Sequence, residues 1–195
     1  LLNGCGFNPM KLQSLTTALF VLCSFSFGAT QANEWQSSST ESRLWFAPSF
    51  EGLPINGNFN QFSVMYSTLP ASLIVRVSID SADLSNEDLN EAIKAADWFA
   101  TAAYPEAVFT SQNILSDGSK TGFLATGKLQ LKGIEKSLQV PFNWVDLGEG
   151  KASMVGELVL GRNDFAIGLG EWATGDQIGL EVRVWFDVRL FTKHE

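Results

Sequence analysis

The side chains that could carry out chemistry in this 195-residue chain are few, and most of them are acidic. Carboxylates act in pairs as general acid and general base when a fold places them around a reacting bond. Solvated caps and turns explain neighbouring carboxylates more simply, so we assign no catalytic residue and keep an enzyme as the alternative hypothesis. The acidic pairs close in sequence are Asp80 with Asp83, Glu87 with Asp88, and Asp164 with Glu171.

Nucleophiles and metal ligands are scarcer still. The chain has one histidine, His194, and two cysteines, Cys5 and Cys23. No cluster of Cys and His has zinc-ligand spacing, and Gly168-Leu169-Gly170 does not follow a strand and open a helix as a phosphate-binding loop would. The sequence therefore predicts no metal site and no bound cofactor.

Arg162 and Asp164 stand two residues apart where an expected strand ends. Side chains two apart along a strand lie on one face of the sheet. This spacing favours an Arg–carboxylate contact that braces the following loop, with recognition of a polar head group as the second interpretation.

The N-terminal part of the chain has the pattern of an export signal. Residues 1–9 are interpreted as an extension upstream of Met10. Residues 10–32 combine one basic residue, an apolar run and a small-residue exit, as in a secretory signal peptide. Ser and Thr interrupt the apolar run, whereas a spanning helix needs about 20 apolar residues, so we expect no stable membrane insertion. We predict cleavage after Ala32 and a periplasmic or secreted protein.

Net charge and cysteine content bear on which partners the chain can bind and on what stabilises it. The formal net charge is −8 and the chain has no basic run, so nucleic acid would be repelled. Both cysteines lie in the segment expected to be removed, so the remaining chain would be stabilised by packing without a disulfide. The oligomeric state, monomer or homodimer, stays open.

The rest of the chain is predicted to be one all-β domain. Residues 33–41 are rich in Ser, Thr and Gln and are expected to form a flexible lead-in to a domain over residues 42–192. In the last segment every second residue is apolar, which is the period of a strand with one buried face. Turn-forming pairs such as Asn56-Gly57 favour antiparallel hairpins. The eight predicted strands cover residues 43–50, 58–69, 73–80, 107–115, 122–132, 138–146, 151–160 and 179–192.

One helix is expected to interrupt the strands and to cover an end of the sheet. Between residues 86 and 99, Leu89, Ala92, Ile93 and Ala96 recur three and four apart, with charged residues on the other face. A capping residue and two acidic residues at its start suit a helix N-terminus.

Eight antiparallel strands can close into a barrel or fold into a sandwich, and periodicity alone does not choose between them. Small residues recur at inward positions, namely Ala125, Gly127, Ala152 and Gly156. They indicate space for a ligand inside a closed sheet. Alternatively, they relieve a bend or taper of the strands.

Five short motifs follow one another along these expected elements. They are Ile79-Asp80-Ser81-Ala82-Asp83-Leu84, Ala96-Asp97-Trp98-Phe99, Tyr104-Pro105-Glu106-Ala107-Val108-Phe109, Ala125-Thr126-Gly127-Lys128-Leu129 and Arg162-Asn163-Asp164-Phe165-Ala166-Ile167-Gly168. In this order, the series resembles the YceI-like family of exported lipid- and polyisoprenoid-binding proteins over residues 42–190. Ala166, where the family usually has glycine, and Glu135, where it often has threonine, depart from the pattern.

The resemblance implies an all-β, eight-stranded antiparallel lipocalin-like barrel with one helix near the barrel end. It also implies a non-catalytic protein that carries or sequesters a long apolar ligand, such as a polyisoprenoid, an isoprenoid quinone or a fatty acyl derivative. One alternative is a lipid- or quinone-modifying enzyme that uses Asp164, Glu171 or Asp80 at the barrel mouth. Another is a structural domain whose barrel is filled by its own side chains. The residues expected to contact the ligand are Phe46, Trp98, Phe123, Leu129, Phe142, Trp144, Met154, Leu158, Phe165, Trp172, Val182, Val184 and Phe186.

Overall fold

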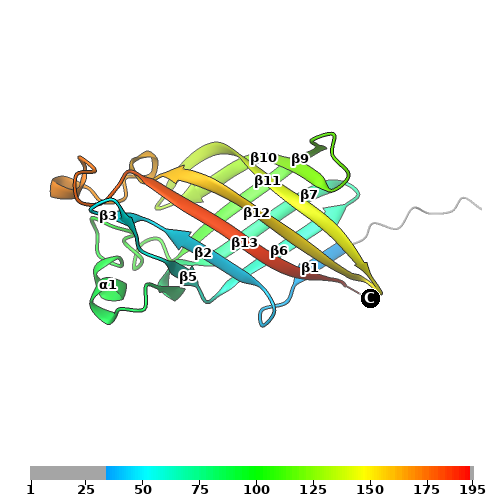
Figure 1. Cartoon of the computed structure of the whole chain (residues 1–195), viewed down its shortest axis with the longest axis horizontal. Helices are drawn as coiled ribbons and strands as arrows, with labels where there is room; N and C mark the ends of the chain where they lie inside the picture. The colour runs from blue at the N-terminus through cyan, green and yellow to red at the C-terminus, as the bar shows by residue number, and fades with distance from the viewer. Residues whose placement is uncertain (1–33, 194–195) are drawn as a thin grey trace, which may run out of the picture. The chain divides into compact units, whose positions relative to one another are not determined.

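A computed structural model describes residues 34–193, whose strands surround a closed interior (Figure 1). The predictions for residues 1–33 and for His194 lie outside the described residues. The strands are β1 (Glu34–Ser37), β2 (Arg43–Ala47), β3 (Ser49–Phe50), β4 (Leu53–Pro54), β5 (Gly57–Phe59), β6 (Phe62–Thr68), β7 (Ala71–Ser78), β8 (Ala82–Asp83), β9 (Glu106–Ser116), β10 (Gly122–Leu131), β11 (Ile134–Gly148), β12 (Lys151–Gly161) and β13 (Glu181–Thr192). The helical elements are α1 (Glu87–Ala92) and the 3-10 turns η1 (Ile79–Ser81), η2 (Arg162–Phe165) and η3 (Gly170–Trp172).

The sheet is an antiparallel meander that closes on itself. Strands β6, β7, β9, β10, β11, β12 and β13 follow one another in space, and β1 joins the two ends by pairing with β6 and with β13. Strand β2 continues along β13, and β5 pairs with β2, so β1 with β2 and β5 with β6 act as two interrupted strands. The predicted eight-stranded antiparallel barrel is therefore confirmed.

The alternating pattern of the last predicted strand also holds in the structure. On β13, Phe186, Val188 and Leu190 are buried inside the barrel. Their partners across the ladder on β12 are Gly156, Met154 and Ala152, so the inward faces of both strands meet the same interior. Each residue between them points outward, as the two-residue period of a strand requires.

The segment 33–41 differs from the flexible lead-in expected from its composition. Its residues 34–37 form β1, which closes the barrel. The reason is Trp35, which is buried and lies opposite Tyr66 of β6 and Thr192 of β13. Burial of this side chain and strand pairing on both sides hold this short polar segment in the sheet.

The helix is shorter than the predicted span of residues 86–99. Helix α1 begins after Asn86, whose side-chain oxygen accepts a 3.0 Å hydrogen bond from the Leu89 amide, and ends at Ala92. The chain then turns, because the Phe99 amide bonds back to the Ile93 carbonyl at 3.0 Å. Figure 1 shows α1 at one end of the barrel, the end that also carries β3. Within residues 34–193 no helix is long and apolar enough to span a membrane.

Candidate functional site

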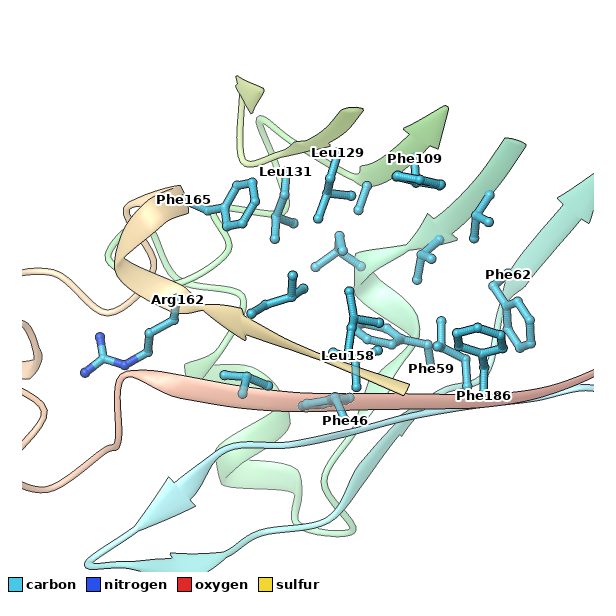
Figure 2. A pocket seen from close by; sticks show the side chains of 18 of the residues that line it. Phe46, Phe59, Phe62, Phe109, Leu129, Leu131, Leu158, Arg162, Phe165 and Phe186 are labelled. Carbon is cyan, nitrogen blue, oxygen red and sulfur yellow. The ribbon is translucent and has the colours of Figure 1, made fainter. Parts of the chain in front are cut away.

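The barrel encloses an apolar cavity of about 220 Å³. Its wall is formed by inward side chains of β2, β5, β6, β7 and β9 to β13, and the loops at the α1 end complete it. Figure 2 shows phenylalanine and leucine side chains converging on this space from several strands. Arg162 is the single charged residue among those that line it. Apart from that residue, the wall can contact a guest only through hydrocarbon and aromatic surface.

Nine of the thirteen residues expected to contact a ligand lie in the cavity wall. They come from four strands (β2, β10, β12 and β13), from the segment after α1 and from η2. These nine are Phe46, Trp98, Leu129, Met154, Leu158, Phe165, Val182, Val184 and Phe186.

Three of the remaining four residues fill the barrel beyond the cavity. On β11, Leu138 and Val140 line the cavity, whereas Phe142 and Trp144 continue the same inward face away from it. Trp144 packs edge-on against Trp35 with ring centroids 5.1 Å apart. These rings pack together inside the barrel next to the cavity. They belong to the core and do not form part of the cavity wall.

The other contacts of this aromatic group complete the closed end. Phe123 stacks on Phe142 with ring centroids 5.6 Å apart, and Tyr66 lies 5.0 Å from Trp144. Burial raises the pKa of the Tyr66 hydroxyl above its ordinary value. A charged phenolate is therefore disfavoured at this end of the barrel.

The fourth residue, Trp172, lies on the outer side of the cavity mouth. Its ring centroid is 6.0 Å from that of Trp98, which does line the cavity. Trp98 in turn lies under Arg162, whose guanidinium carbon is 5.9 Å from the ring centroid. The three side chains link η3, the segment after α1 and η2 at this end of the barrel.

Arg162 braces the loop that follows it, but not through the acidic partner expected from the sequence. Its guanidinium donates to backbone carbonyls, including Gly168 at 2.8 Å and Gly179 at 2.9 Å. Asp164 instead points to solvent, 4.0 Å from Lys136. Burial lowers the pKa of Arg162. In Figure 2 the guanidinium points away from the apolar side chains, so the aliphatic part of Arg162 faces the cavity.

A second basic residue at the mouth also has a backbone acceptor. The Lys132 ammonium donates to the Ala166 carbonyl at 2.7 Å. Burial lowers the pKa of Lys132, and the nearby charge of Asp97 opposes part of that effect. Lys132 therefore holds η2 against the β10–β11 turn.

The acidic residues considered for catalysis are not brought together in the cavity. Asp80, Asp164 and Glu171 are all exposed, and none of them belongs to the cavity wall. Residues 34–193 also contain no group of three or more His, Cys, Asp or Glu side chains placed to hold a metal ion. The acid–base alternative finds no assembled site in this part of the chain.

Sequence reasoning missed several aromatic residues of the wall. Phe59 and Phe62 both face the cavity although they are three residues apart, because the chain is interrupted between β5 and β6 and the alternation shifts there. Phe109 also lines the cavity, and its alternation with the buried Ala107 in β9 was a usable signal.

Two inward glycines leave room for phenylalanine rings close to the backbone. A Cβ at Gly127 would lie 2.7 Å from the ring of Phe109 and 2.3 Å from the Thr110 carbonyl oxygen. A Cβ at Gly57 would lie 2.6 Å from the ring of Phe46. Gly127, one of the small residues that indicated internal space in the sequence, therefore accommodates the ring of Phe109, which itself lines the cavity.

A closed antiparallel barrel around an apolar cavity defines a lipocalin-like class of binding fold. Comparison with known sequences then places the chain more closely. The YceI-like domain family model matches residues 35–190, and the chain belongs to this family.

Relatives and solved structures agree with this assignment. A UPF0312 protein of Pseudomonas putida (strain W619) is 32% identical over 142 residues, which cover 67% of this chain and 72% of the relative. The crystal structure of BcnA from Burkholderia cenocepacia matches with a TM-score of 0.73 and 27% identity, covering 78% of this chain and 98% of BcnA. A polyisoprenoid binding domain from Saccharophagus degradans has the same fold, with a TM-score of 0.68 and 18% identity, covering 82% of this chain and 98% of that domain.

Proposed function

We propose that this protein binds a long apolar molecule in its barrel cavity and carries or sequesters it without changing it chemically. The observation that carries the proposal is the cavity itself, whose single charged lining residue turns its charge away from the space. The ligand class is a polyisoprenoid, an isoprenoid quinone or a fatty acyl derivative. The polyisoprenoid binding domain with the same fold supports the first of these.

The hydrophobic effect provides sufficient affinity for such a ligand. Burial of apolar surface is favourable by about 25 cal/mol per Å², or about 0.8 kcal/mol per CH₂ group. A chain of ten buried methylene or methyl groups would thus gain roughly 8 kcal/mol before the cost of association. No hydrogen bond to the ligand is needed, which suits a wall made of Phe, Leu, Val and Ile side chains.

The same proposal includes export. Residues 10–32 would direct the chain across a membrane and be removed after Ala32, leaving the binding domain in the periplasm or outside the cell. The signal-peptide pattern of charge, apolar run and small-residue exit supports this step. N-terminal sequencing of the protein recovered from an expressing bacterium tests it, with a new terminus at Asn33 expected.

The binding proposal is tested by titrating the protein with retinol, a fluorescent isoprenoid alcohol. Leu158 lines the cavity and Val159, next to it on β12, is 59% exposed. Leu158→Trp places a large ring in the cavity and should weaken retinol binding at least tenfold. Val159→Trp adds the same ring to the outer face and should leave binding unchanged. Equal affinities for the two variants would contradict binding inside the barrel.

A further inference from the structure

Arg162 is a buried charge for which the proposed function has no direct use. Only 3% of its surface is exposed. Within residues 34–193 no carboxylate lies within ion-pair distance of it. A buried charge without an opposite charge is unfavourable unless hydrogen bonds replace the lost water. The partners of this guanidinium therefore indicate what it stabilises.

We define the mouth loop as residues 166–180. The guanidinium donates to carbonyls near both ends of this loop and to one in its middle. Arginine offers five N–H donors in a rigid plane, whereas lysine has one compact ammonium. The wide, planar fork of arginine reaches two separated stretches of backbone at once, whereas the three donors of lysine all lie on one nitrogen. The acceptors are the carbonyls of Ile167 (2.9 Å) and Gly168 (2.8 Å) for Nη1, Ile178 (2.8 Å) and Trp172 for Nη2, and Gly179 (2.9 Å) for Nε, with the Asn163 side-chain oxygen at 3.2 Å from Nη1.

Gly168 is shaped to accept this guanidinium. A Cβ at residue 168 would lie 2.4 Å from Arg162 Nη1, closer than non-bonded atoms approach. Its φ angle of +69° is also one that glycine adopts without strain. The conformation of the loop and the position of the guanidinium thus depend on each other.

The mouth loop is held from its other side by the segment that follows α1. The amides of Gly168 and Leu169 donate to the Asp97 carbonyl at 2.8 and 3.2 Å. The next residue, Trp98, contacts both the Arg162 guanidinium and Trp172. The loop contributes Ile167 and Ile178 to the cavity wall, so its position decides how that end of the cavity is closed.

We propose that Arg162 is a positioning residue that fixes the mouth loop over the cavity and thereby controls how fast the ligand enters and leaves. This inference rests on the proposed function. It adds that exchange is limited by separation of the mouth loop from Trp98 and Asp97, and that Arg162 sets the rate of that separation. Because its acceptors are neutral carbonyls, the contact does not depend on the ionisation of a carboxylate.

The test measures release of bound retinol into an excess of phosphatidylcholine vesicles. Arg162→Lys keeps the charge but loses the planar fork, and should speed release at least tenfold. Leu190→Ala is the control, because Leu190 is buried on β13 but does not belong to the cavity wall. It lowers stability without touching the mouth and should release retinol at the wild-type rate. Release from Arg162→Lys within twofold of Leu190→Ala would overturn the inference.

Two further measurements keep the inference testable if Arg162→Lys does not fold or if retinol does not bind. Gly168→Ala displaces the guanidinium from the other side and should accelerate release in the same way. Hydrogen exchange needs no ligand, and the amides of residues 168 and 169 should exchange at least tenfold faster in either variant, with β10 and β11 amides unchanged. Unaltered protection of these two amides would overturn the role of Arg162. Failure of the wild type to bind retinol would instead count against the proposed function.

Discussion

The ring of Phe186 lies over Gly156 of the neighbouring strand. A Cβ at residue 156 would come within 2.5 Å of Phe186 Cζ and 2.4 Å of the Pro141 carbonyl oxygen. The two residues are direct partners across β12 and β13. The missing side chain therefore leaves room for a large ring directly against the backbone of the neighbouring strand.

Gly156→Ala is expected to destabilise the protein, because one of the two clashing atoms belongs to the backbone and cannot rotate away. Overpacking of this kind costs about 1–3 kcal/mol in free energy of unfolding. Urea denaturation measures the change. Glu157→Ala, one residue along β12 on the outer face, should stay within about 0.5 kcal/mol of wild type. Equal stabilities for the two variants would show that the wall can shift to admit the methyl group.

Gly57→Ala should have a different effect, because the nearest atoms are the ends of the Phe46 and Leu84 side chains. Both can move, and because Phe46 lines the cavity, displacement of its ring away from residue 57 would take up cavity space. We expect retinol affinity to fall about tenfold, equivalent to about 1.4 kcal/mol. The loss of folding stability should be below that of Gly156→Ala. Wild-type affinity would mean that the Phe46 ring does not occupy cavity space when displaced.

Trp144→Ala tests the aromatic group at the closed end. It removes a ring that contacts both Trp35 and Tyr66, and large-to-small changes of this kind cost about 3–5 kcal/mol. The neighbouring Val145 is 44% exposed, so Val145→Ala should change stability by no more than about 0.5 kcal/mol. Thermal unfolding separates the two. A small loss for Trp144→Ala would mean that these rings pack loosely.

Asp83 is expected to make stability depend on pH. Hydrogen bonds from the Asn90 side chain and then from the Ser85 amide lower the pKa of this partly exposed carboxyl. A folded-state pKa below the unfolded value means that the stabilisation is present above about pH 4 and is lost as pH falls through the folded pKa. Wild type should therefore melt higher than Asp83→Asn at pH 6, and the gap should close at acid pH. A gap that persists at about pH 2 would contradict this role.

The strands were predictable because their signal is local. Every predicted strand has a counterpart, and the inward positions of β12 and β13 follow directly from alternation, as with Met154 opposite Val188. The predicted helix was too long because Trp98 and Phe99 continue its apolar pattern. In the structure these two residues follow the helix and line the cavity. The spacing of apolar residues cannot distinguish a helix face from a loop that lines a cavity.

The limits of the cavity and the contacts of Arg162 could not be predicted. Val140 and Phe142 share one face of β11, and only the packing of distant aromatic rings decides that the cavity includes the first and not the second. The acceptors of Arg162 are backbone carbonyls, which every residue has, so no sequence pattern indicates them. The sequence offered Asp164, two positions away, as the partner of Arg162, but in the structure Asp164 is exposed to solvent.

Native mass spectrometry of the protein, purified without detergent or denaturant, tests the central claim most directly. We predict a species heavier than the polypeptide by one lipid-sized mass, which organic extraction releases as an apolar chain compound. The Leu158→Trp variant should lack this species, and Val159→Trp should retain it. A wild-type protein that is repeatedly found without any bound lipid, and that takes up none when retinol or a prenyl alcohol is added, would contradict the account.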